Sequence, residues 1–211
     1  MFSVKNNLLK ARLGARNNGY LIELFGRGRL KNHPALLGCA EKTLRRHART
    51  LTRIFDGERW KRFPPLIASA QATVEARARF LDKLFGSAIW KHQPHLVSRD
   101  PKKLLQNARF VERLVGSRRW IYYPALLAHD QAHLREKARH LTELCGGSHW
   151  KTYPQLLSFR RETLDARAAR LTALVGRAWH TRPYLLILPP SKVRRAVRVL
   201  VRKQKTRTLP S

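Results

Sequence analysis

The hydrophobic and polar positions of this chain repeat at an interval of 30 residues, most visibly from Pro34 to Pro64 and from Trp60 to Trp90. Counted from each proline as position 0, apolar residues recur at +2, +10, +17 and +20 or +21, alanine recurs at +14, and glycine at +22. The spacings from +10 to +21 are those of one face of an α-helix, so they predict a long amphipathic helix in each repeat. The alanine marks a point where another helix crosses closely. The prolines in this register are Pro34, Pro64, Pro94, Pro124, Pro154 and, one residue early, Pro183.

The ends of these elements are also predicted. Glycine at +22 fits a left-handed residue that ends the long helix, with Gly57 one residue late in its repeat. Asp100 followed by Pro101 is typical of a helix N-terminus. The stretch from each tryptophan to about +5 predicts a short helical element entered through the repeat proline, and the segment from the glycine to the tryptophan predicts a turn or 3₁₀ piece. No useful length of the repeat alternates with a period of two, so strands are not expected.

Units of this kind cannot bury their apolar faces alone and must stack on one another. The sequence therefore predicts an all-α, helical-repeat solenoid of about six 30-residue units. This domain is expected over residues 23–202, after a basic N-terminal arm at 1–22 and before a basic C-terminal tail at 203–211. The tryptophans at the unit junctions are interpreted as core residues rather than as platforms on which nucleic-acid bases stack.

Residues 151–176 resemble one repeat of the mitochondrial transcription termination factor (mTERF) family. The resemblance rests on Pro154, the Leu156-Leu157 pair, the leucine-spaced helix that follows, and the closing Gly176. The last unit, from Pro183 to Val193, is similar, and the resemblance extends over about residues 20–202. It implies an all-helical, curved solenoid with a basic groove, an organellar location, and binding of duplex DNA or structured RNA.

Charge points to a polyanionic partner. The chain holds 44 Lys and Arg against 13 Asp and Glu, a net charge of +31. Nucleic acid is the usual partner of such a chain, because each neutralised phosphate releases condensed counterions. A membrane surface is the alternative, but charge spread over every repeat does not resemble a basic amphipathic helix or a lipid anchor. No apolar run approaches the roughly 18 residues of a transmembrane helix.

The candidate nucleic-acid-binding residues fall into three groups. The first is an arginine at +15 on a flank of the long helix, replaced by Ala169 in the fifth repeat, which we call the arginine ladder. The second follows the tryptophans at the repeat junctions. The third is the C-terminal region, which has no acid from residue 177 onward and suits contact with folded RNA. For the first two groups, a solvated or solubilising charged surface is the alternative interpretation. The groups are, in order, Arg49, Arg79, Arg109 and Arg139; Lys61, Lys91, Lys151 and Arg182; and Lys192, Arg194, Arg195, Arg198, Arg202, Lys203, Lys205 and Arg207.

Catalytic chemistry has little support in the sequence. His129 and His133 have the spacing of one helix face, but the glutamate of a metalloprotease motif is missing. Cys39 and Cys145 are too far apart for a zinc-finger spacing, and isolated ligands near Cys145 do not make a zinc site. Phosphate-binding glycine loops and nucleophile motifs are missing too. We expect no enzyme activity, no cofactor, no metal and no small-molecule substrate.

The N-terminal segment indicates an organelle. Residues 1–22 carry basic and apolar residues without acid, which is typical of a transit peptide, so 1–22 is a retained import signal or a basic arm. A mitochondrion is expected, with a chloroplast as the alternative. Three functions remain open: an RNA-binding structural protein of the mitochondrial ribosome that contacts rRNA and neighbouring ribosomal proteins, an mTERF-type transcription termination factor on double-stranded DNA, and a protein-interaction scaffold. The first is preferred because basic charge lies on both termini as well as on the repeats.

Overall fold

The structure is a computed structural model that describes residues 19–30 and 32–207, with residues 199–207 described by their backbone only. The chain divides into two compact units between Leu105 and Gln106, inside helix α5 (Pro101–Val115). Within the described ranges the secondary structure is helical, without strands, so the all-α prediction is confirmed. The order of elements is the same in each repeat: one long α-helix is followed by two short 3₁₀ helices.

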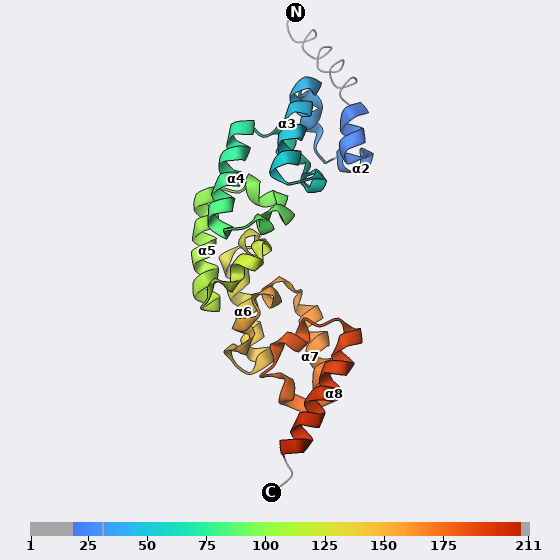
Figure 1. The fold of residues 1–211 in the computed structure, drawn as a ribbon, viewed down its shortest axis with the longest axis vertical. Helices are drawn as coiled ribbons and strands as arrows, with labels where there is room; N and C mark the ends of the chain where they lie inside the picture. The colour runs from blue at the N-terminus through green and yellow to red at the C-terminus, as the bar shows by residue number, and fades with distance from the viewer. Residues whose placement is uncertain (1–18, 31, 208–211) are drawn as a thin grey trace, which may run out of the picture. The chain divides into compact units, whose positions relative to one another are not determined.

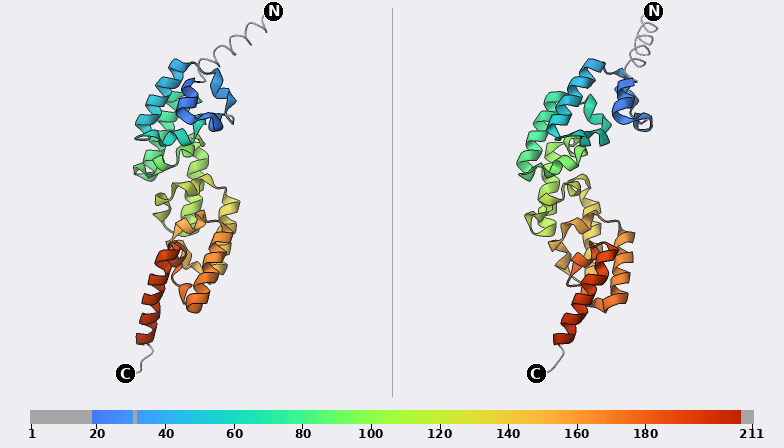
Figure 2. Two further views of the ribbon diagram at one scale, coloured as in Figure 1. Left: turned by 90° about the vertical axis from the view of Figure 1, so that its right-hand side faces the viewer. Right: turned by 45° about the vertical axis from the view of Figure 1, so that its right-hand side comes forward.

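The long helices correspond to the predicted amphipathic segments, and they lie beside one another within each unit (Figures 1 and 2). In the first unit α3 contacts α4, and in the second α6 contacts α7, which contacts α8. The last helix continues through residue 207, so the first residues of the segment expected as a tail, 203–207, belong to α8. The helices are α2 (Arg27–Leu30), α3 (Glu41–Ile54), α4 (Gln71–Phe85), α5, α6 (Gln131–Cys145), α7 (Arg161–Val175) and α8 (Pro190–Arg207); residues 19–25 are also helical.

The segment from tryptophan to leucine forms two 3₁₀ helices in each repeat, where one short helical element was expected. The division falls at the residue before the repeat proline, whose backbone lies outside the α region, as in Phe63 (φ −132°, ψ 77°) and Tyr153 (φ −125°, ψ 69°). A residue before proline is excluded from the α region by its clash with the proline ring, so one continuous helix cannot form. The tryptophan-centred helices are η2 (Glu58–Arg62), η4 (Ala88–His92), η6 (Arg118–Tyr122), η8 (Ser148–Thr152) and η10 (Gly176–Trp179). The proline-led helices are η1 (Pro34–Gly38), η3 (Pro64–Ala68), η5 (Pro94–Ser98), η7 (Pro124–Ala128), η9 (Pro154–Ser158) and η11 (Pro183–Leu186).

The helix ends agree with the sequence in most repeats. Gly86 (φ 65°) and Gly146 (φ 63°) are left-handed and follow α4 and α6, as predicted. The first repeat differs, because Asp56 occupies position +22 with φ 50° and Gly57 follows with φ 134°. Aspartate is among the few residues that tolerate the left-handed conformation, so Gly57 does not take the place expected of it. At the other end, Asp100 Oδ1 accepts a hydrogen bond from the Lys102 amide at 3.0 Å, which confirms the predicted start of α5.

The tryptophans are core residues, as interpreted from the sequence. Trp60, Trp90, Trp120, Trp150 and Trp179 are each at most 1% exposed. The indole nitrogens of Trp60, Trp90, Trp150 and Trp179 donate to a side chain near the end of the preceding long helix, for example Trp60 Nε1 to Thr52 Oγ1 at 3.0 Å and Trp150 Nε1 to Thr142 Oγ1 at 2.9 Å. These four tryptophans are therefore fixed both by packing and by a directional hydrogen bond.

Consecutive repeats are also joined by hydrogen bonds from position +13 of a long helix to the proline-led 3₁₀ helix of the next repeat. Residues of four types occupy this position in five repeats, and each contacts the carbonyl of the third residue after the next repeat proline. An unpaired backbone carbonyl at a helix end is costly to bury, and at each of these junctions the contact gives that carbonyl a hydrogen-bond partner. The pairs are His47 Nδ1 with Ile67 O (2.8 Å), Arg77 Nη1 with Val97 O (3.2 Å), Asn107 Nδ2 with Leu127 O (3.2 Å), Lys137 Nζ with Leu157 O (2.9 Å) and Arg167 Nη1 with Leu186 O.

Each unit thus consists of an α-helical layer and a 3₁₀ layer, and both layers contribute residues to the protein surface. Long helices contact long helices, as α3 does α4 and α6 does α7, while 3₁₀ helices contact 3₁₀ helices, as η2 does η5 and η6 does η9. Buried leucine, valine and tryptophan side chains lie between the layers. Outward-facing residues of the repeat therefore belong either to the α-helical layer or to the 3₁₀ layer.

Candidate nucleic-acid interface

The arginine ladder lies on the long helices α3 to α6. Arg49, Arg79, Arg109 and Arg139 are all exposed, since each follows the buried alanine at +14 and points away from the core. Within the described ranges, Arg49, Arg79 and Arg109 form no hydrogen bond or ion pair with another side chain. Arg139 differs, because its Nε lies 4.0 Å from Glu143 Oε1. The first three arginines are thus available to bind phosphate groups, whereas the fourth lies close to the carboxylate of Glu143.

The residues that share a helix face with each ladder arginine determine how much positive charge that face carries. Positions +8, +12, +15 and +19 lie on one face because they are three or four residues apart. On α3 all four positions are basic and exposed: Lys42, Arg46, Arg49 and Arg53. Arg53 Nη2 also approaches Glu75 Oε1 at 3.3 Å, but its side chain remains 75% exposed. We call these four residues the α3 basic face.

The same face becomes less basic along the chain. On α4 it carries Arg79 and Lys83, and on α5 it carries Lys102, Arg109 and Arg113. On α6 it carries two glutamates beside the single arginine, and on α7 it carries one glutamate and three alanines. The complete set on these two helices is Ala132, Glu136, Arg139, Glu143, Glu162, Ala166, Ala169 and Ala173. A phosphate track along the α-helical layer therefore has its strongest segment on α3.

The lysines that follow the tryptophans are not equivalent. Lys61 Nζ contacts Glu58 Oε1 at 2.5 Å, and Lys91 Nζ contacts Asp56 Oδ2 at 2.6 Å, and both lysines are less than a quarter exposed. Their charge is partly balanced within the first unit. Lys151 and Arg182 in the second unit are partly exposed, and their 3₁₀ segments contain no carboxylate to pair with. Of the predicted contact residues at the repeat junctions, the two in the first unit are therefore paired with acids, whereas the segments around the two in the second unit offer no carboxylate.

The C-terminal group lies on α8. Val193 and Val197 are buried, while Lys192, Arg194, Arg195 and Arg198 are exposed. This separation gives the described part of α8 one apolar side and one basic side. Arg202, Lys203, Lys205 and Arg207 lie on the helical backbone that follows, and their side chains are outside the described part. Residues 1–18 of the N-terminal arm are outside it as well.

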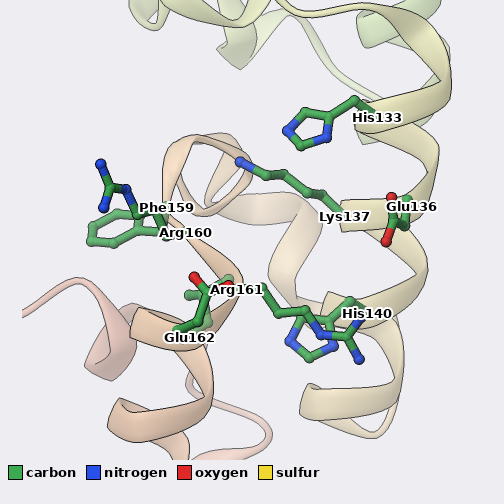
Figure 3. Close-up of a pocket in the computed structure, with 9 residues that line it drawn as sticks. His133, Glu136, Lys137, His140, Phe159, Arg160, Arg161 and Glu162 are labelled. Atoms are coloured by element: carbon green, nitrogen blue, oxygen red, sulfur yellow. The ribbon is translucent and has the colours of Figure 1, made fainter.

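A cavity of about 250 Å³ lies between α6 and the start of α7 (Figure 3). Its charges are mixed: Lys137 and Arg161 line it together with Glu136 and Glu162. Lys137 Nζ donates to the Leu157 carbonyl, and burial lowers the pKa of this ammonium group. No three histidine, cysteine or acidic side chains of the described residues come together to bind a metal ion. The cavity is therefore part of the junction between two repeats, and its chemistry does not select a ligand.

The sequence analysis missed two features of this surface. Lys42, Arg46 and Arg53 were not selected, although their spacing from Arg49 would have identified a fully basic helix face. Tyr122 was also missed; it is 62% exposed and lies in η6. A tyrosine in a predicted turn gives no sequence signal that separates an exposed ring from a buried one.

No family model, curated protein or solved structure matches this chain. None of the helices in the described ranges is long and apolar enough to cross a bilayer. The charge and geometry of the surfaces described above are therefore the features that bear on function.

Proposed function

We propose that the protein is an RNA-binding structural component of the mitochondrial ribosome, in which the repeats stack as an mTERF-like solenoid and hold rRNA by its phosphates. The observation that carries this proposal is the α3 basic face, whose four exposed side chains belong to a chain with a net charge of +31. The acids are too few to neutralise such a surface within the chain. A polyanion is the partner that this charge would stabilise most.

The mechanism is electrostatic and depends on a rigid surface. From Lys42 to Arg53 the α3 basic face extends about 16 Å along the helix, at 1.5 Å per residue. Since Arg46, Arg49 and Lys42 project from one packed helix, their charges are held in a row instead of being dispersed on a mobile segment. Such a row contacts the backbone of a nucleic acid and is indifferent to base identity. Arg79 and Lys83 add a second row on α4 of the same unit.

RNA is favoured over duplex DNA because the basic residues are not confined to one face. The exposed arginines of α8 and the acid-free 3₁₀ segments of the second unit add positive surface to that of α3. A folded RNA presents phosphates in several directions, and proteins recognise it mainly through shape and backbone. A protein that binds duplex DNA needs only one basic face, so in the termination-factor alternative the basic residues outside that face would have no phosphate partner.

The test compares two triple variants that remove the same charge. The first is Lys42→Gln, Arg46→Gln and Arg49→Gln on α3, and its matched control removes three exposed arginines from the α-helical layer of the second unit. Binding to a fluorescein-labelled RNA hairpin is measured by anisotropy over a series of salt concentrations. The control variant is Arg139→Gln, Arg161→Gln and Arg170→Gln.

We expect the α3 variant to weaken binding and to reduce the slope of log K against log salt by roughly two to three, because each lost phosphate contact removes about 0.7 to 0.9. The control variant should change the slope much less. Equal effects of the two variants would overturn the assignment to α3. If a DNA duplex of the same sequence binds more tightly than the RNA hairpin, the proposal of an RNA-binding protein is wrong and the termination-factor alternative is favoured.

A further inference from the structure

The acids of the second unit are segregated by layer. Within residues 106–207 there are six of them, and all lie on long helices or at the residue that caps one: Glu112, Asp130, Glu136, Glu143, Glu162 and Asp165. The 3₁₀ helices η6, η7, η8, η9, η10 and η11 contain none. Their exposed or partly exposed cations include Arg118, Arg119 and Lys151. In this unit the 3₁₀ layer is therefore purely basic, while the α-helical layer is mixed.

The first unit lacks this segregation. Its long helices carry the α3 basic face but also Glu41, Glu75 and Asp82. Its 3₁₀ layer contains Glu58, which pairs with Lys61, and the preceding turn contains Asp56, which pairs with Lys91. The acid-free 3₁₀ layer is therefore a property of the second unit, and it is a second candidate surface for nucleic acid in addition to the α3 basic face.

Tyr122 gives the second surface a different chemistry. Only two large hydrophobic side chains of the described residues are exposed, Tyr122 at 62% and Leu174 at 45%. The equivalents of Tyr122 in other repeats are Arg62, His92 and Thr152, so the position faces solvent and the fold does not require an aromatic ring there. An exposed ring in an acid-free basic surface is the combination that stacks on unpaired bases and attracts their phosphates.

The backbone beneath this ring is held firmly. Trp120, two residues earlier, is 1% exposed, and Pro124, two residues later, is buried. The Tyr123 amide donates to the Trp120 carbonyl at 2.8 Å. Arg119 Nη1 donates to the Thr152 carbonyl at 3.3 Å, which joins η6 to η8 and brings the segment containing Lys151 beside η6. The ring therefore projects from a fixed 3₁₀ turn, so little backbone entropy is lost when a base stacks on it.

We propose that the 3₁₀ layer of the second unit binds unpaired nucleotides of RNA, with one base stacked on Tyr122 and the adjoining phosphates contacted by Arg118 and Lys151. This inference rests on the proposed function, since it assumes that the chain binds RNA. It goes further by giving the two units different ligands: paired RNA on the α3 basic face, and unpaired nucleotides on η6 and η8. The two units would then bind different kinds of segment of a folded RNA.

The experiment measures the affinity of the full chain for two probes, a fluorescein-labelled oligouridylate and a blunt-ended RNA duplex. Tyr122→Ala should weaken oligouridylate binding about five- to a hundredfold, the usual range for loss of one base–aromatic stack. The salt slope should not change, because no charge is removed. Tyr122→Phe, which keeps the ring, should bind as the parent does. The affinity for the RNA duplex should be the same for all three proteins.

Leu174→Ala is the matched control, because it removes the other exposed hydrophobic side chain, from α7 in the α-helical layer. The inference is overturned if Tyr122→Ala leaves oligouridylate affinity unchanged, if Leu174→Ala weakens it equally, or if Tyr122→Phe loses as much as Tyr122→Ala. The two proposals fail separately. If the parent protein does not bind the RNA duplex, the proposed function is contradicted. Duplex binding together with an oligouridylate affinity that Tyr122 does not affect would count against this inference alone.

Discussion

Replacing Trp150 with alanine tests whether the tryptophans hold the repeats together. The indole is 1% exposed and its Nε1 donates to Thr142 Oγ1 at 2.9 Å, so the substitution removes both a large buried surface and a hydrogen bond. Burial of about 150–250 Å² at about 25 cal/mol per Å² corresponds to roughly 4–6 kcal/mol as an upper bound. Measured large-to-small substitutions of buried tryptophan cost about 3–5 kcal/mol. We expect a loss of this size in the free energy of unfolding of the second unit.

The assay is urea unfolding followed by far-ultraviolet circular dichroism. Tyr122→Ala is the control, since it removes an aromatic ring from the same unit that is exposed instead of buried, and it should change the free energy by no more than about 0.5 kcal/mol. Thr142→Val separates the hydrogen bond from the packing: it leaves the indole N–H without its acceptor and should cost about 1–3 kcal/mol. If Trp150→Ala unfolds at the same urea concentration as Tyr122→Ala, the assignment of the tryptophans to the core is refuted.

Three further predictions concern junctions and titratable groups. Arg167→Met removes the donor to the next repeat and should destabilise the second unit by about 1–3 kcal/mol in the same urea assay, whereas Arg161→Met on the exposed surface should have little effect. Burial, and secondarily a nearby arginine, lower the pKa of His95. As the pH falls, the unfolded chain therefore binds a proton at this residue before the folded chain does. The thermal midpoint should fall as the pH drops below about 6.5, and His95→Gln should reduce that fall. Burial raises the pKa of the Cys145 thiol to about 11, so iodoacetamide should alkylate partly exposed Cys39 in the folded protein but Cys145 only on unfolding, as mass spectrometry would show.

Much of the fold could be predicted because it depends on residues with one dominant property. The positions of Leu156 and Leu164 in the repeat predict that they are buried, and Gly146 ends a helix because it can adopt φ 63°. Trp150 is buried because its large apolar ring is costly to expose to water. The divided short segment was harder to predict, because it follows from the conformation of Tyr153 before its proline rather than from any apolar pattern.

The hydrogen bonds between repeats could not be predicted from residue type. Position +13 is histidine, arginine, asparagine, lysine and arginine in successive repeats, and only their shared ability to donate to a carbonyl unites them. A search for recurring residues passes over such a position. The structure identifies it because the five acceptors are equivalent.

The candidate site was predicted in part. The exposure of Arg49, Arg79 and Arg109 follows from the buried alanine before each of them. What the sequence search did not consider is the context of each arginine, which is fully basic on α3 and mixed around Arg139. The difference is electrostatic and depends on several neighbours at once, so a single repeated position cannot reveal it.

The central claim is that the chain is a structural RNA-binding protein of the mitochondrial ribosome, and sedimentation of a mitochondrial lysate tests it most directly. The account predicts that the protein migrates with a ribosomal subunit, remains there after DNase treatment, and is released when the RNA is digested. Migration with nucleoid DNA that DNase abolishes, or migration as free protein that RNase does not affect, would contradict it.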